Sequence, residues 1–144
     1  MNKILEVALS QIGIKEIIGT KHSPQVLKYF HQTGFKGIRN DETAWCSAFV
    51  NWVAYIAGYQ RSGALNARSW LDIGERINFP KQGDIVIFWR ESVESWKGHV
   101  GIFINQIDDD IFVLGGNQDN QVCIKKYPVS RLLAFRRLQF VGWK

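Results

Sequence analysis

Residues 84–104 read DIVIFWRESVESWKGHVGIFI, and they set the fold class of the chain. Two short runs rich in β-branched and aromatic residues, 84–89 and 100–104, flank a polar segment, which predicts two β-strands joined by a loop. Three further runs of the same kind follow at 111–114, 122–124 and 132–135. We therefore expect the second half of the chain to form a sheet of five to six strands.

The first half carries helical patterns instead. Apolar residues at helical spacing predict helices at 3–14, 24–34, 45–57 and 66–76. Ser23 and Pro24 are typical of a helix start. Thr43 is a candidate N-cap of the third helix, and Gly58 is its candidate stop. Helices followed by strands with short connections predict an α+β fold with a mostly antiparallel sheet.

Length and composition limit the structural classes to which the protein can belong. The chain has 144 residues, of which 46% are hydrophobic and 22% charged. These values predict a single globular domain over residues 1–144 and argue against a disordered or fibrous protein. Two cysteines and three histidines are too few for a disulfide scaffold or a zinc-finger pattern. We expect no metal and no cofactor.

The N-terminal segment indicates in which cellular compartment the protein is made. Residues 1–10 read MNKILEVALS, where Glu6 interrupts the apolar run early and no small-residue cleavage site follows, so the segment is a poor signal peptide. No stretch reaches the ~20 apolar residues that a membrane helix needs. We expect synthesis in the cytoplasm, no membrane insertion and a monomer.

Cys46 is the first candidate for a chemical role. It lies about three positions into the helix that Thr43 would cap, where unpaired N–H groups and the helix dipole stabilise an anion. A thiol there forms the reactive thiolate more readily. The alternative is that Cys46 is a small buried hydrophobe. Cys123, between apolar neighbours, is expected to be a free thiol in the core.

His99 and Asn117 are the candidates for its partners. His99 follows Gly98 and opens the strand at 100–104, so it can act as base and acid for a thiol at a helix start. Asn117 follows the strand at 111–114 and could hold the imidazole in the required tautomer. Each has an alternative: His99 as a polar surface or capping residue, and Asn117 as a turn residue after two glycines.

These residues carry a family resemblance. The segment 41–50, DETAWCSAFV, resembles the nucleophile segment of NlpC/P60 and CHAP cysteine peptidases. The segments 83–88, GDIVIF, and 98–103, GHVGIF, resemble their next two signatures. Asn117 falls where CHAP enzymes place a polar third residue. The resemblance spans residues 2–138 and is to the small phage-associated type.

The resemblance implies a papain-like fold, with N-terminal helices packed on the sheet, and hydrolysis of peptidoglycan. The bond cut would lie within the stem peptides (endopeptidase) or between peptide and glycan (N-acetylmuramoyl-L-alanine amidase). His99 would take the Cys46 proton, the thiolate would attack the amide carbonyl, and the Cys46 backbone N–H would stabilise the oxyanion. A thioester would then be hydrolysed by water.

One departure from the family affects the third residue. CHAP enzymes often carry a glutamate two residues before the asparagine, and here that position is Gly115. Asp41 and Glu42 are the candidates for an assisting acid, with loop solvation as their alternative role. The candidate substrate contacts are Trp45, Trp70, Trp96 and Gln118.

The formal charge of +5 is concentrated near the C-terminus. Residues 1–120 hold 12 basic and 13 acidic residues, whereas residues 121–144 hold six basic and no acidic residues. We expect a basic last hairpin that docks to an anionic wall polymer, with a solvated strand face as the alternative. The candidate docking residues are Lys125, Lys126, Arg136 and Arg137.

Two other functions compete with hydrolysis. One is a catalytically inactive wall-binding module on the same fold, which should lack one of Cys46, His99 or Asn117. The other is a nucleic-acid-binding domain, for which no motif of interleaved basic and aromatic residues is present. With a poor signal peptide, the expected route to the wall is holin-dependent release of a phage endolysin or injection of an effector, the latter with an immunity protein as partner.

Overall fold

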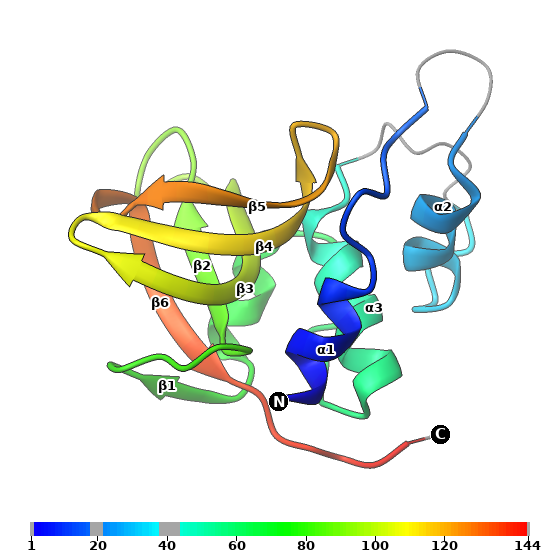
Figure 1. The fold of residues 1–144 in the computed structure, drawn as a ribbon, viewed down its shortest axis with the longest axis horizontal. Helices are drawn as coiled ribbons and strands as arrows, with labels where there is room; N and C mark the ends of the chain where they lie inside the picture. Colours follow the sequence, from blue (N-terminus) through cyan, green and yellow to red (C-terminus); the bar gives the residue numbers. More distant parts are fainter. Residues whose placement is uncertain (1, 18–21, 38–43, 144) are drawn as a thin grey trace.

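The computed structural model describes residues 2–17, 22–37 and 44–143. In the described ranges the elements are α1 (Lys3–Leu9), α2 (Pro24–His31), α3 (Cys46–Ala57), the 3₁₀ helix η1 (Ala67–Asp72), β1 (Glu75–Ile77), β2 (Ile85–Trp89), β3 (Gly98–Ile107), β4 (Asp110–Gln118), β5 (Gln121–Pro128), the 3₁₀ turn η2 (Val129–Arg131) and β6 (Leu132–Arg137). The three α-helices lie to one side of a six-stranded sheet (Figure 1). This is the α+β architecture predicted from the sequence.

The strand order of the sheet is β1-β6-β2-β3-β4-β5, and neighbouring strands pair antiparallel throughout. Strands β2 to β5 follow one another as a meander. The chain then returns so that β6 pairs between β1 and β2. Consequently β5 and β6, which are adjacent in sequence, lie on opposite sides of the three central strands. The basic last hairpin expected from the sequence does not form.

The alternation of side chains along β2 fills two apolar clusters. Ile85 and Ile87 belong to the main core under the helices, while Val86 and Phe88 belong to a second cluster with residues of β3, β4 and β6. Successive strand residues point to opposite faces of a sheet, so a run of four apolar residues requires both faces to be covered. The register shifts in the β2–β6, β3–β4 and β4–β5 pairings, and shifts of this kind bend and twist the strands that carry them.

Helix α3 is the central element of the helical side. It packs against β3 and β4 on one side and against α1 and α2 on the other. Ten of its twelve residues are buried, which explains why it is apolar almost all round. It ends as predicted, with Gly58 in the left-handed conformation at φ 83°.

Helix boundaries differ from the expectation in four places, one of them the end of α2, which lies at His31 and not at residue 34. Helix α1 ends at Leu9, and Ile12 is 46% exposed, so the predicted stripe to residue 14 is too long. Helix α3 begins at Cys46 itself, and the predicted cap Thr43 lies outside the described residues. The predicted helix at 66–76 is a 3₁₀ helix followed by strand β1.

The start of α2 agrees with the sequence pattern. Ser23 is the N-cap, its hydroxyl accepts from the Val26 N–H at 3.3 Å, and Pro24 is the first helical residue. Within the described ranges, the helices are too short or too polar to span a bilayer.

Candidate active site

The first residue of α3 meets the second residue of β3. Cys46 and His99 are 8% and 7% exposed, and the thiol hydrogen-bonds to the imidazole. Because α3 packs on β3, the helix start and the strand mouth lie together although 53 positions separate the two residues. The sequence-based pairing of this cysteine with this histidine is therefore present in the structure.

The surroundings of Cys46 favour its thiolate. Burial is the largest single effect and raises the pKa of the Cys46 thiol, but the hydrogen bond and charge of His99, together with two backbone donors, outweigh it. The backbone N–H groups of Val100 and Ser47 also donate to the sulfur. The net result is a pKa below the ordinary cysteine value, which is typical of a nucleophile.

The backbone N–H of Cys46, at the start of α3, is a second group beside the sulfur. Trp45 is the N-cap, and its side chain makes no capping hydrogen bond. The first N–H groups of a helix have no partner within the helix, and among the described residues none accepts from the Cys46 N–H. This N–H lies at the helix start next to the sulfur, where such groups can donate to an anion.

The far side of the imidazole is held by Gln118. Its Oε1 lies 2.9 Å from His99 Nε2, and the side chain is only 1% exposed. We expected Asn117 to make this bond and Gln118 to contact substrate, and the structure gives a different assignment. Asn117 instead lines the cleft beside Cys46, and buried Gln118 faces the histidine.

The β4–β5 turn explains this one-residue difference. Asp119 and Asn120 form the two-residue loop with φ of 53° and 61°, as in a type I′ turn. Asn117 also has a left-handed φ of 57°, and the strand register shifts between Gly115 and Gln118. A bulge of this kind changes which side chain points to a given face.

Tyr127 of β5 is a site residue that sequence reasoning missed. Its hydroxyl lies 3.2 Å from His99 Nε2, and its ring stacks on the imidazole with a centroid distance of 5.0 Å. Burial and the neighbouring Cys46 charge raise the pKa of Tyr127, so the hydroxyl stays protonated. Only the β4–β5 pairing brings this strand to the histidine, so no local sequence signal identifies it.

A cleft opens over the Cys46–His99 pair. One cavity of about 250 Å³ is lined by both residues together with Leu65, Trp96 and Asn117. A second of about 320 Å³ shares Arg90, His99 and Asn117 with it and continues toward Tyr127 and Arg131. The groove therefore runs past the imidazole on both sides, which allows an extended substrate to lie across the sulfur.

A protein-family model for the CHAP domain matches residues 38–117, which include Cys46, His99 and Asn117. The chain belongs to the CHAP family. This is a family of papain-like cysteine amidases and peptidases that act on cell-wall peptidoglycan. A search of curated proteins found no matching relative.

Two of the tryptophans expected in the CHAP cleft are in the core. Trp45 is fully buried, donates to Glu16 and stacks on Tyr29. Trp70 is also fully buried and donates to Ser47 Oγ at 2.9 Å. Neither can reach a substrate, because each indole N–H is used inside the fold. Trp96 is 70% exposed and lines the cleft.

The loop that carries Trp96 is held by Arg68 of η1. Arg68 donates to the backbone carbonyls of Lys97, Val93 and Ser92 at 2.8, 2.6 and 2.9 Å. Three carbonyls from one short loop converge on a single planar guanidinium. This contact sets one wall of the cleft, and sequence reasoning had left Arg68 without a role.

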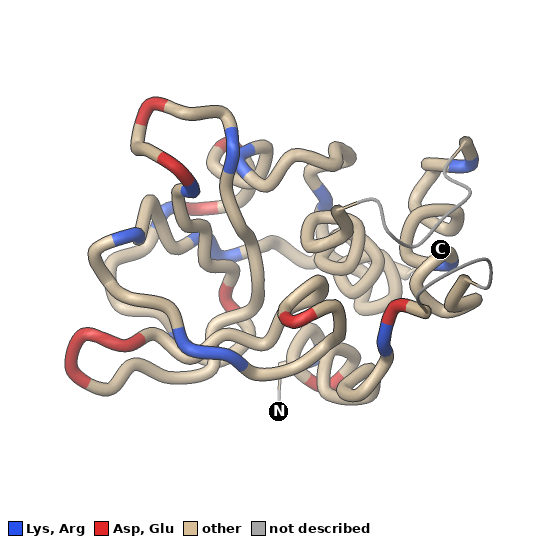
Figure 2. Tube along the Cα trace, turned by 90° about the horizontal axis from the view of Figure 1, so that it is seen from above, with Lys and Arg blue, Asp and Glu red and all other residues tan. Residues whose placement is uncertain are grey.

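The expected basic docking surface is not present as one patch. Lys125 and Lys126 lie on β5 and pair with Asp119 and Asp110 at 2.9 and 3.8 Å. Lys and Arg positions are spread over both the sheet and the helical side of the molecule (Figure 2).

The two arginines of β6 are structural. Arg136 donates to the carbonyls of Ile73 and Gly74 at 2.8 and 2.7 Å. Arg137 donates to both oxygens of Asp84, whose side chain is 6% exposed. These donors join β6 to neighbouring segments, and the docking role expected of the two arginines stays a prediction.

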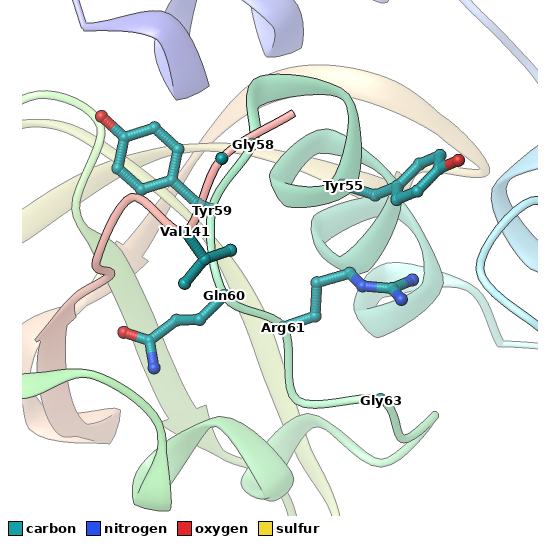
Figure 3. Close-up of a pocket in the computed structure, with 8 residues that line it drawn as sticks. Tyr55, Gly58, Tyr59, Gln60, Arg61, Gly63 and Val141 are labelled. Atoms are coloured by element: carbon teal, nitrogen blue, oxygen red, sulfur yellow. The ribbon is translucent and has the colours of Figure 1, made fainter. Parts of the chain in front are cut away.

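A separate cavity of about 320 Å³ lies at the other end of α3. Tyr55, Tyr59, Arg61 and Val141 are among the residues that line it (Figure 3). The Arg61 guanidinium lies over the Tyr55 ring at 5.1 Å. Neither Cys46 nor His99 lines this cavity, so it is separate from the cleft over that pair.

Asp41 and Glu42 lie outside the described residues. Within the ranges that the structure describes, no group of three or more His, Cys, Asp or Glu side chains could hold a metal ion.

Proposed function

We propose that this CHAP domain hydrolyses an amide bond of peptidoglycan through a Cys46 thiolate and a thioester intermediate. The observation that carries the proposal is the buried Cys46–His99 pair at the floor of an open groove. A structural cysteine would have no need of a lowered pKa, a histidine partner and access to a cleft.

The steps follow from the groups in place. His99 takes the thiol proton, and the thiolate adds to the amide carbonyl carbon. The Cys46 N–H stabilises the oxyanion that forms. The C–N bond then breaks as His99 returns the proton to the leaving amine. Water, deprotonated by His99, attacks the thioester and releases a carboxylate and the free thiol.

The charge of the groove favours an anionic peptide. Arg90 and Arg131 line the cavity on the tyrosine side of His99, and stem peptides carry free carboxylates. Trp96 on the other side provides an exposed aromatic surface against a peptide or sugar. The cationic side and the aromatic side of the groove together suit a stem peptide near its junction with the glycan.

Digestion of purified peptidoglycan with mass analysis of the fragments tests this proposal. New free amino groups within stem peptides identify an endopeptidase, and glycan freed of peptide identifies an amidase. The Cys46→Ala variant is the negative control. Absence of new fragments from several wall chemotypes would reject hydrolysis and favour the inactive wall-binding module.

We further propose a lytic role, as a phage endolysin or an injected antibacterial effector. The support is the activity class, because cleavage of peptidoglycan weakens the cell wall. Expression in a bacterial host with and without a fused export signal tests this role. Lysis only on export supports it, and growth unaffected by export of the active enzyme contradicts it.

A further inference from the structure

The space beside His99 is shared between Gly115 and Gln118. A Cβ at Gly115 would lie 2.4 Å from Gln118 Oε1 and 3.5 Å from His99 Nε2. Gly115 is not in the left-handed region, where glycine would be favoured for its backbone alone. What the position requires is room for the Gln118 amide.

The amide orientation of Gln118 is determined by its neighbours. Its Nε2 donates to the carbonyls of Val113 and Cys123 at 3.2 and 2.7 Å. Only the amide nitrogen can donate to these two oxygens, so Oε1 must be the atom 2.9 Å from His99 Nε2. That oxygen can only accept, so His99 Nε2 carries a hydrogen. Nδ1 is then the nitrogen free to take the Cys46 proton.

We propose that Gln118 is the positioning residue of His99, that an amide is required there, and that Gly115 is its necessary counterpart. The proposal rests on the proposed Cys46–His99 chemistry. One group must accept from the imidazole and donate to two backbone carbonyls at once. An ionised carboxylate would place a bare oxygen against those carbonyls, so it cannot replace the amide.

The decisive measurement is the pH dependence of Cys46 alkylation by iodoacetamide, followed on the Cys46 peptide by mass spectrometry. In Gln118→Leu the nearer acceptor for Nε2–H is lost, and only the Tyr127 hydroxyl at 3.2 Å remains beside it. We expect the midpoint of the pH profile of Cys46 alkylation to move to higher pH by about one unit. The alkylation rate at pH 7 should fall about 10-fold. An unchanged midpoint in a folded Gln118→Leu protein overturns the proposal.

Gln118→Glu tests the requirement for an amide. Its folded-state carboxyl would face two carbonyl oxygens, which favour the protonated form. The variant should therefore lose thermal stability relative to wild type as the pH rises from 5 to 8. A Gln118→Glu protein that is as stable and active as wild type at pH 8 would contradict that requirement.

A double-mutant cycle tests the pairing with Gly115. Gly115→Ala should displace Gln118, so Gly115→Ala, Gln118→Ala and the double variant should show similar losses of alkylation rate. Losses that multiply would show that the two positions act independently. Gly37→Ala is the matched control, because a Cβ at Gly37 meets nothing within 4 Å.

The variant Tyr127→Phe distinguishes the effect of the Tyr127 hydroxyl on His99 Nε2 from that of Gln118 Oε1. It removes the hydroxyl at 3.2 Å and keeps the stacked ring, so the midpoint should move less than in Gln118→Leu. A larger shift for Tyr127→Phe would assign the positioning role to Tyr127 instead. Alkylation needs no wall substrate, so an absence of peptidoglycan cleavage in wild type would reject the proposed function and leave this test intact.

Discussion

The guanidinium of Arg137 donates from Nε and Nη2 to the two carboxylate oxygens of Asp84, at 2.9 and 2.8 Å. This pair joins the end of β6 to the residue before β2. Asp84 also accepts from the Lys81 N–H at 2.7 Å. The Gly83-Asp84 motif thus has a structural role at this corner of the sheet.

Replacing Arg137 with Gln should destabilise the fold. It would leave a nearly buried carboxylate without its bidentate partner, at a cost of about 2 kcal/mol in the free energy of unfolding. Urea unfolding measures this cost. Lys126→Gln is the control, because its pair with Asp110 is 3.8 Å long and exposed, and it should change stability by less than ~0.5 kcal/mol.

Replacing Cys46 with Ala should abolish turnover and leave the fold intact. The change removes the nucleophile and only one small side-chain atom from the packing. Fragment release from peptidoglycan and a thermal melt measure the two properties. Retained hydrolysis in Cys46→Ala would show that another group attacks the substrate.

Replacing His99 with Ala should reverse the direction of the Cys46 pKa shift. In wild type the pKa of Cys46 is lowered, so alkylation should reach half its maximal rate below the ordinary cysteine value of about 8.5. Without His99, burial is left as the dominant effect and raises the pKa of the thiol. The midpoint should then exceed that value, and turnover should fall at least ~10²-fold.

The control for His99→Ala is His31→Ala at the exposed end of α2. It removes an exposed imidazole that does not line the cleft over Cys46, so neither the pH midpoint of alkylation nor turnover should change. A midpoint in His99→Ala that equals that of wild type would show that the helix start and the backbone donors lower the pKa without the histidine.

Replacing Arg68 with Ala should loosen the wall of the cleft that carries Trp96. Three loop carbonyls would lose their donor, and the loop would sample other conformations. We expect KM to rise about 10-fold with a smaller change in kcat, because the catalytic pair is untouched. A soluble stem-peptide substrate measures both constants. A fall in kcat alone would place Arg68 in the chemistry.

Replacing Arg90 with Gln should weaken binding of substrates that carry a carboxylate. We expect KM to rise for an acidic stem peptide and to change little for its amidated form. Arg61→Gln is the matched control, since Arg61 lines the cavity at the far end of α3 (Figure 3). An equal change in KM for both peptides would mean that Arg90 does not bind the carboxylate of the substrate.

The pairing of Cys46 with His99 could largely be predicted from local sequence. A cysteine at the start of an apolar helix and a histidine after a glycine at a strand mouth each carry a physical reason for reactivity. The positions of Gln118 and Tyr127 could not be predicted, because they depend on a bulge in β4 and on the pairing of β4 with β5.

Aromatic and basic residue types were poor guides to exposure. Trp45 and Trp70 were candidate substrate contacts by residue type, yet both are fully buried and donate to distant polar partners, Glu16 and Ser47. Arg137 looked free in a sequence segment without acids, yet its carboxylate partner lies 53 positions away. Residue type alone does not show which donors are used inside the fold.

The sequence by itself determined the order of helices and strands, the helix that begins near Cys46 and the strand that opens at His99. These features follow from periodicity and turn chemistry over a few residues. Only the tertiary structure decided which side chain holds the imidazole, which tryptophan reaches the cleft and which cations are paired. Those properties depend on strand order and register, which bring together residues that are far apart in the chain.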